Sequence, residues 1–350
     1  MTAPGALSEA VSRVEAELVA FWTAAAEAQS QKCARAATMN FVAVSAPAEV
    51  AGIRGAVEDL AHTRAGRAFL LTVDGRLAPW DVESDVSAVC HKEGDTVVCY
   101  DRIELFFGAM AAVRAASVVS ALSLPEVPTI VEIGRGAPGP LTDALVKGAD
   151  RVIVDSAATP IGRIAEIAGK TRSPLADRDF VRTFSWREFT ARFFDEAPGA
   201  ERAIGRVEIE RARGERGDPA ALLVGWLASR LGWRFASAAS AIDAEGVPVE
   251  IVVTDARSRE LPAGELGSVR ITAAIDGRPL FCEVSRKAGE RVVRWSMSGT
   301  RASRHEHPLG FRDEGWVLRK AIDSAEADAV YRASALAGAA WDALGREAAR

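Results

Sequence analysis

Hydrophobic and polar residues in the first half of the chain alternate between helical spacing and short apolar runs. Residues 6–30 carry Val14 and Leu18 at a spacing that predicts an amphipathic helix. The apolar runs 40–44 and 68–73 predict two strands with a helical segment between them. A strand, a helix and a strand in this order predict a βαβ unit, in which the two strands are parallel.

The next two apolar runs predict a β-hairpin. They cover residues 86–90 and 96–105, and Gly94 in the connection supplies the positive φ that tight turns need. Cys90 and Cys99 fall on opposite arms of this hairpin. Because a one-residue slip of register changes which side chains face each other, the pattern leaves open whether the sulfurs meet. We expect two buried thiols rather than a disulfide.

Further strands and helices alternate up to about residue 200, which predicts an open, mostly parallel sheet of the α/β class. The strand over 151–155 is apolar almost throughout, as in strands buried on both faces. Residues 171–182 are charged and predict a loop, and Ser185 followed by Glu188 predicts a capped helix start. The other elements predicted here are helices over 109–122 and 139–148, a strand over 128–133, and a helix beginning at Thr159–Pro160.

After a linker over 195–205, strands are grouped together and helices follow them, which is an α+β pattern. A helix over 218–231 is apolar almost all round and is therefore predicted to be buried, with Trp226 and Trp233 in the core. The remaining predicted elements are strands over 206–210, 249–254, 268–274, 281–285 and 292–297, and helices over 314–323 and 325–347.

The length of the chain and this change of pattern predict two domains. A chain of 350 residues exceeds the usual size of a single core. We predict an N-terminal α/β domain over residues 1–200, whose first thirty residues form a peripheral helix. A C-terminal α+β domain is predicted over residues 201–350.

Composition and charge narrow the function classes. With 26% charged residues and a net charge of −5, the chain lacks the concentrated basic surface of a nucleic-acid-binding protein. No apolar run approaches the ~20 residues needed to cross a bilayer, and Glu9 and Glu15 argue against a secretory leader. The four cysteines lack the close paired spacing of zinc sites. We therefore expect a cytoplasmic protein that binds neither nucleic acid nor membrane.

Three short polar motifs are candidates for chemistry, and each has a structural alternative. Arg135, between two glycines, suggests a phosphate-binding turn, but the rest of a phosphate-loop motif is missing and a strand break is favoured. Asp155 and Ser156 lie at the carboxyl end of a predicted parallel strand, where α/β sheets bind ligands, or they cap the connection to the next helix. His305 and His307 would need a strand and further ligands to hold a metal. We predict no metal, no cofactor and no catalytic residue.

Trp186 and Arg187 stand out inside the predicted capped helix. The capping box needs neither an aromatic ring nor a guanidinium, whereas Trp and Arg are the residue types that anchor protein interfaces. Alternatively, Trp186 is tucked between the two domains. We name Trp186 and Arg187, together with Asp155, Ser156 and Arg135, as candidate partner-binding residues.

A set of motifs from about residue 33 onward is specific when taken together. In chain order they are Asn40, Arg67, Arg102–Glu104, Leu124–Pro128, Asp150–Ser156, Trp186–Glu188, Phe193–Asp195 and Leu222–Trp233. This set resembles the glucose-6-phosphate dehydrogenase assembly protein family (OpcA), most strongly over 149–233. The chain departs from that family at Thr129–Ile133, where many members carry an aromatic, Trp-rich strand, and this bears on any contact made through those aromatics.

The resemblance implies a protein that is not itself an enzyme. It implies an allosteric activator that binds glucose-6-phosphate dehydrogenase, promotes its assembly or active state, and supports NADPH production in the oxidative pentose phosphate pathway. The competing hypothesis is a sugar- or nucleotide-phosphate-binding enzyme with Asp155, Ser156 and Arg135 at its strand ends. An assay of the dehydrogenase with and without this protein separates the two.

Overall fold

The computed structural model places the chain in two compact units. Unit 1 comprises Met1–Asp155, Gly169–Ala176 and Asp313–Ala325, and unit 2 comprises Ser156–Ala168, Asp177–Arg312 and Glu326–Arg350. The change of sequence pattern near residue 200 marks the start of the second sheet and not a single boundary between the units. The structure describes residues 4–28, 33–35, 38–61, 64, 66–93, 96–212, 219–256, 265–286, 292–299, 302–308, 312–324 and 328–348.

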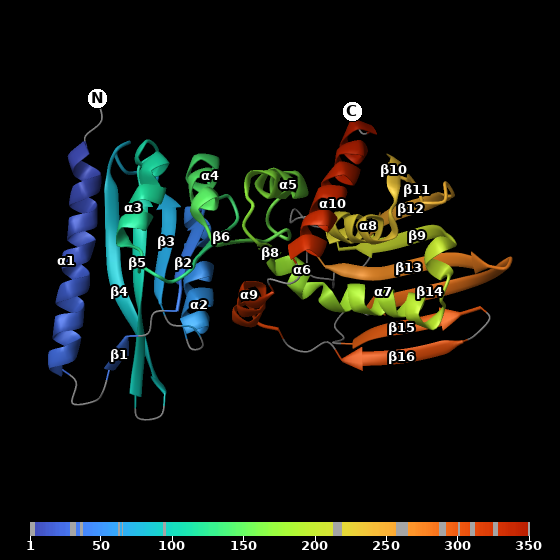
Figure 1. Ribbon diagram of the computed structural model, residues 1–350, viewed down its shortest axis with the longest axis horizontal. Coiled ribbons are helices and arrows are strands. Elements are labelled where there is room, and N and C mark those ends of the chain that lie inside the picture. The colour runs from blue at the N-terminus through green and yellow to red at the C-terminus, as the bar shows by residue number, and fades with distance from the viewer. Residues whose placement is uncertain are drawn as a thin grey trace. The chain divides into compact units, whose positions relative to one another are not determined.

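The sheet of unit 1 is mostly parallel (Figure 1). Its strands lie in the order β1-β5-β3-β2-β6-β7-β8, and β4 pairs with β5. β2 is parallel to both β3 and β6, whereas β4 and β5 form an antiparallel hairpin, so the predicted βαβ unit and hairpin are confirmed. The strands are β1 Cys33–Arg35, β2 Asn40–Ser45, β3 Arg67–Val73, β4 Val82–Glu93, β5 Thr96–Phe107, β6 Thr129–Ile133, β7 Arg151–Val154 and β8 Leu175–Asp177.

Helices flank this sheet. In α1, Ala10, Val14 and Leu18 are buried at one-turn spacing, as the amphipathic pattern predicts, and α1 packs against β4 and α3. α2 packs against β3 and α9. Every residue of β2 is buried, as in a parallel strand covered on both faces. The helices are α1 Pro4–Ala28, α2 Val50–Ala61, α3 Ala115–Leu122, α4 Gly139–Gly148 and α9 Glu314–Asp323, and α5 Ile161–Lys170 leads from unit 2 back to unit 1.

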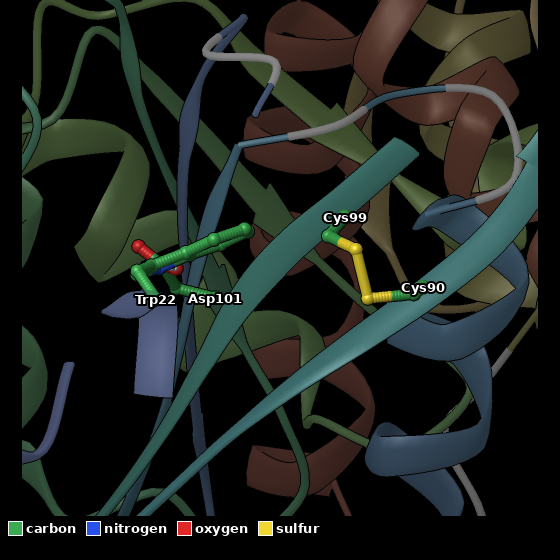
Figure 2. Close-up of a disulfide and its surroundings, with 4 residues drawn as sticks. All are labelled: Trp22, Cys90, Cys99 and Asp101. Carbon is green, nitrogen blue, oxygen red and sulfur yellow. Dashed lines mark hydrogen bonds between the residues drawn. A yellow bond between two sulfur atoms is a disulfide. The ribbon is translucent and has the colours of Figure 1, made fainter. Parts of the chain in front are cut away.

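The β4–β5 hairpin places Cys90 directly opposite Cys99, and the two residues form a disulfide (Figure 2). Their Cα atoms are 4.1 Å apart, close to the spacing of directly facing residues in an antiparallel pair. The prediction of two separate buried thiols is therefore wrong. The pairing register decided the outcome, and the hydrophobic pattern did not determine that register.

Two buried carboxylates of β5 are paired with residues from other elements. Asp101 accepts a hydrogen bond from Trp22 Nε1 at 2.8 Å (Figure 2) and forms an ion pair with Arg67 at 2.8 Å. Glu104 pairs with Arg54 at 2.6 Å. Because a buried charge is costly without a partner, these contacts hold α1, β3 and α2 against the hairpin.

Unit 2 is built on a second sheet, in the order β10-β11-β12-β9-β13-β14-β15-β16 (Figure 1). β9 and β12 are parallel, and the other neighbours are antiparallel. The sequence does not predict β10 and β11, which have only four and three residues, or β16, whose six residues carry no apolar pattern. The strands are β9 Ile204–Arg211, β10 Arg234–Ser237, β11 Ser240–Ile242, β12 Pro248–Asp255, β13 Leu266–Ile275, β14 Arg278–Arg286, β15 Val292–Ser298 and β16 Ser303–Pro308.

The segment 171–182 is ordered structure and not the predicted loop. It contains β8 and α6 (Arg178–Arg182), and Asp177 caps α6 by accepting a hydrogen bond from the Asp179 N–H at 2.7 Å. Three of the charges that suggested a solvated loop, on Asp177, Arg178 and Asp179, are instead buried at the start of this short helix.

The predicted capping box at Ser185 is also wrong. α7 (Phe184–Glu196) begins one residue before Ser185, with Thr183 in the N-cap position. Because α6 ends at Arg182, little chain remains between the two helices for a separate N-cap. The predicted linker also contains regular structure, since α7 continues to Glu196 and β9 begins at Ile204.

The helices α8 (Pro219–Leu231) and α10 (Asp328–Ala348) approach each other at two glycines. A Cβ added at Gly225 would lie 2.1 Å from the Ser334 carbonyl oxygen, and one at Gly338 would lie 2.4 Å from the Ala221 carbonyl oxygen. Only a residue without a side chain fits these positions. The predicted burial of the helix is confirmed, and so is that of Trp233, but Trp226 is part-exposed.

Candidate functional site

Arg135 and Asp155 lie on the loops that follow β6 and β7. These parallel strands are neighbours, with Ile133 opposite Val154, so both residues lie at the carboxyl-terminal edge of the sheet, where α/β proteins bind ligands. Arg135 has 46% of its side chain exposed, and its guanidinium is 3.9 Å from Glu49. The predicted positions at strand ends are confirmed, and the predicted binding role stays a prediction.

Backbone packing accounts for the glycines that flank Arg135. The Gly134 N–H donates to the Val44 carbonyl at 2.7 Å, and a Cβ at Gly134 would lie 2.9 Å from the same oxygen. Gly136 has a φ of +67°, which favours glycine, and the Arg135 carbonyl accepts from the Ala46 N–H at 3.1 Å. The two glycines therefore join the ends of β6 and β2, which supports the strand-break interpretation.

Ser156 belongs to a buried polar cluster in unit 2. One carboxylate oxygen of Asp177 accepts from the backbone N–H of Ser156 at 3.1 Å and from that of Asp179 at 2.7 Å. All three residues are buried, together with Arg178. The Ser156 hydroxyl is buried and has no hydrogen-bond partner among the described residues. The sequence offered one signal for this cluster, an Asp placed to cap a helix, but the surrounding charges pointed to a loop.

Trp186 and Arg187 lie inside unit 2, with 6% and 7% of their surface exposed. The Arg187 guanidinium donates from Nη1 to Thr183 Oγ1 at 2.8 Å and from Nη2 to the Phe180 carbonyl. It also stacks over the Phe180 ring, 3.4 Å from the ring centroid. Arg187 therefore joins α7 to α6.

The electrostatics of Arg187 follow from this burial. Loss of solvation lowers the pKa of Arg187 to about 9, and the carboxylates of Asp177 and Asp179 oppose that shift. The guanidinium therefore stays cationic at neutral pH and balances part of the negative charge of the cluster. These contacts favour a role for Trp186 and Arg187 in holding the unit together, and the predicted partner contact stays a prediction.

His305 and His307 of β16 both contact the guanidinium of an arginine. Arg192 of α7 has Nη2 at 3.3 Å from His305 Nε2 and Nη1 at 3.4 Å from His307 Nε2. A guanidinium here repels a metal cation from both nitrogens. Within the described parts of the chain, no group of three or more His, Cys, Asp or Glu side chains is arranged to hold a metal ion. The pair instead packs β16 against α7, with His307 stacked on Phe189 at 4.5 Å.

The sheet of unit 2 has one apolar face and one charged face. α7, α8 and α10 pack against the sheet, and apolar residues such as Ile271 and Trp295 are buried. Many of the residues that alternate with these are charged, and three pairs of opposite charges face each other across neighbouring strands. The pairs are Arg206–Glu250 at 2.5 Å, Arg270–Glu283 at 3.2 Å and Arg294–Glu306 at 2.9 Å. Phe281, which is 47% exposed, alternates with these residues on β14.

Comparison with known proteins adds what the geometry does not show. Two family profiles match the chain in sequence order, one described as the glucose-6-phosphate dehydrogenase subunit N-terminal domain over residues 57–169 and the other as its C-terminal domain over residues 173–335. The chain belongs to the OpcA family. This confirms the resemblance seen in the motifs, and the descriptions associate the OpcA family with glucose-6-phosphate dehydrogenase.

Curated relatives carry the same family name. A putative OxPP cycle protein OpcA from Nostoc punctiforme is 33% identical over 168 residues, and one from Synechococcus elongatus is 30% identical over 169 residues. Each alignment covers 44% of this chain, and they span 35% and 37% of those OpcA proteins.

Two solved structures have a distant likeness to this chain. A 3-ketoreductase from Actinomadura kijaniata has 11% identity and a TM-score of 0.49, with 89% of this chain and 97% of that chain covered. An oxidoreductase from Sinorhizobium meliloti has 14% identity and a TM-score of 0.47, with 90% of this chain and 98% of that chain covered.

Among the described helices, none has the length and apolar character that a membrane span requires.

Proposed function

We propose that this protein binds glucose-6-phosphate dehydrogenase and promotes its active state, as an allosteric activator in the oxidative pentose phosphate pathway. The observation that carries the proposal is the pair of family matches, which follow each other in order over residues 57–169 and 173–335. In this proposal the protein is not itself an enzyme, and its effect is an increase in the NADPH that the dehydrogenase produces. The proposed cytoplasmic location rests on the sequence pattern alone.

Activation of this kind has a thermodynamic requirement. A binding protein shifts an equilibrium only by its difference in affinity for the two states. Moving the dehydrogenase from mostly inactive to mostly active takes about 5.5 kcal/mol of differential affinity. A few aromatic or arginine anchors in one interface supply energies of this size.

The five candidate partner-binding residues differ in how they would act. Arg135 is exposed and Asp155 is part-exposed, so the partner can reach both side chains. Trp186, Arg187 and Ser156 are buried, and in our proposal they act through the shape of unit 2. The charged face of the unit 2 sheet offers a further surface, because arginines and an exposed aromatic ring are typical of interfaces.

Sedimentation of the two purified proteins, alone and mixed, tests the proposal. We expect a new, heavier species in the mixture, and we expect this protein alone to turn over no sugar or nucleotide phosphate. Two separate boundaries at concentrations far above the cellular range would contradict the proposal. Turnover of a phosphorylated substrate by this protein alone would instead support the phosphate-binding enzyme as the alternative.

A further inference from the structure

The strand β16 forms one edge of the unit 2 sheet (Figure 1). Within the described parts of the chain, β16 pairs with β15 alone. An edge strand presents backbone N–H and C=O groups that can pair with another chain. Along β16, Arg304, Glu306 and Pro308 are exposed, whereas Ser303, His305 and His307 are half-buried.

One arginine of β16, at the edge of the unit 2 sheet, has no acidic partner in the part of the chain that the structure describes. On the charged face, Arg294 of β15 lies opposite Glu306 of β16, and the two form an ion pair at 2.9 Å. Arg304 lies on the same face, two residues from Glu306, but it is opposite Ser296. Arg304 is exposed and has no ion-pair or hydrogen-bond partner among the described residues. Arg304 is therefore a cation at the edge of the sheet with a serine, and no carboxylate, opposite it on β15.

A second copy of the chain supplies that carboxylate. If two β16 strands pair antiparallel with His305 opposite His305, then position 304 of each copy faces position 306 of the other. The two-fold symmetry places Arg304 opposite Glu306 of the second copy twice, and side chains on one face of directly opposite positions are in contact. The run of paired charges on the charged face then continues from Arg294 through Glu306 to Arg304 of the second copy.

We propose that this protein forms a two-fold dimer in which β16 pairs antiparallel with β16 of a second copy, centred on His305. Pro308 has no backbone N–H to donate and so limits the paired segment to the positions from Ser303 to His307. A pairing this short buries little surface. The dimer is therefore reversible, and dilution and added salt weaken it.

Charge reversal tests the register of this pairing. In Arg304→Glu the two axis-related pairs become Glu–Glu, and in Glu306→Arg they become Arg–Arg. Each variant alone should dimerise roughly tenfold or more weakly than the unchanged protein, since like charges directly opposite are destabilising. When the two variants are mixed, both axis-related pairs of the mixed dimer are again Glu–Arg, so the mixture should regain the dimer, although the Arg294–Glu306 pair within the Glu306→Arg copy is lost. Sedimentation over a concentration series measures all three samples.

Arg278→Glu is the matched control. Arg278 is an exposed arginine on β14 of the same sheet, away from β16, and its reversal should leave the dimer unchanged. Circular dichroism of each variant confirms folding. A wild-type protein that stays monomeric throughout the micromolar range overturns the proposal. A dimer that both single variants retain also overturns it, as does a mixture of the variants that stays monomeric. The proposal is also overturned if β16 binds the dehydrogenase but does not pair with a second copy of this chain.

Discussion

At the scale of single residues, Arg187→Ala should destabilise the protein. Arg187 is buried, and it faces the carboxylates of Asp177 and Asp179. Removing one partner from a buried charged cluster leaves the others uncompensated, so we expect the free energy of unfolding to fall by about 3–5 kcal/mol. Urea unfolding followed by circular dichroism measures the loss.

Arg135→Ala is the matched control for that change. Arg135 is exposed and lies 3.9 Å from a part-exposed Glu49, so its loss should change the free energy of unfolding by less than about 0.5 kcal/mol. An Arg187→Ala protein that unfolds like the wild type but binds the dehydrogenase more weakly would support the interface interpretation and refute the structural one.

Cys282 should be inert to thiol reagents in the folded protein. Burial raises the pKa of the Cys282 thiol to about 12, with the charges of Glu283 and Glu196 adding to the shift. The folded pKa lies above the unfolded value, so this group's contribution to stability is full below pH 9 and is lost as pH rises from 9 to 12. Peptide mapping after alkylation at pH 8 should show Cys282 modified only when urea is present. Rapid modification without urea would mean that the site is open.

The sequence predicts where a residue lies relative to a strand end better than it predicts whether the side chain is buried. Arg135 and Asp155 lie at strand ends as predicted, because a strand end can be read from where an apolar run stops. Trp186 and Arg187 were harder to place, because an aromatic ring and a guanidinium occur both in interfaces and in satisfied buried sites. The difference depends on Thr183 and its neighbours in α6, a helix that the charged sequence did not predict.

At the scale of elements, the disulfide should stabilise the β4–β5 hairpin. Cys90 and Cys99 are nine positions apart, and closing a loop of that size stabilises a protein by roughly 2–3 kcal/mol in the chain-entropy model. Reduction should therefore lower the melting temperature of the wild type. It should not lower that of Cys99→Ser, which lacks the bond. Equal melting with and without reductant in the wild type would show that the bond contributes nothing.

Gly225→Ala should separate α8 from α10. The added Cβ would lie 2.1 Å from the Ser334 carbonyl and 2.4 Å from the Gly338 nitrogen, and neither backbone atom can move alone. We expect a loss of about 3 kcal/mol or more in the free energy of unfolding.

Gly52→Ala is the control for that substitution. Gly52 lies in the helix α2, and a Cβ there meets nothing within 4 Å. Alanine is the better helix former, so stability should stay the same or rise by up to about 1 kcal/mol. Equal effects of the two substitutions would contradict the close approach of α8 and α10.

Elements with strong periodicity could be predicted, and elements defined by their neighbours could not. β2, α2 and β3 carry their own apolar pattern, so their type and order followed from the sequence. β10 has only four residues and is largely exposed, and β16 has no apolar pattern, so they are strands only because β11 and β15 lie beside them. α6 has five residues, too few for a helical period to appear.

At the scale of the whole molecule, the chain forms two units, one with a mostly parallel sheet and one with a mostly antiparallel sheet, and no single point in the sequence separates them. Unit 1 takes Gly169–Ala176 and Asp313–Ala325 from beyond its main segment. A change of composition along the chain does not reveal that these two segments belong to unit 1, because each segment is short. The family matches cover both halves of the chain and place them in one protein family.

Titration of the dehydrogenase with this protein tests whether this protein is an activator. The initial rate of NADPH formation is measured at a fixed, subsaturating glucose 6-phosphate concentration while the concentration of this protein is raised. We predict a saturable increase in kcat/KM that levels off at a fixed ratio of the two proteins, and we expect heat-denatured protein to have no effect. Rates that stay constant up to a large molar excess of folded protein would contradict the account.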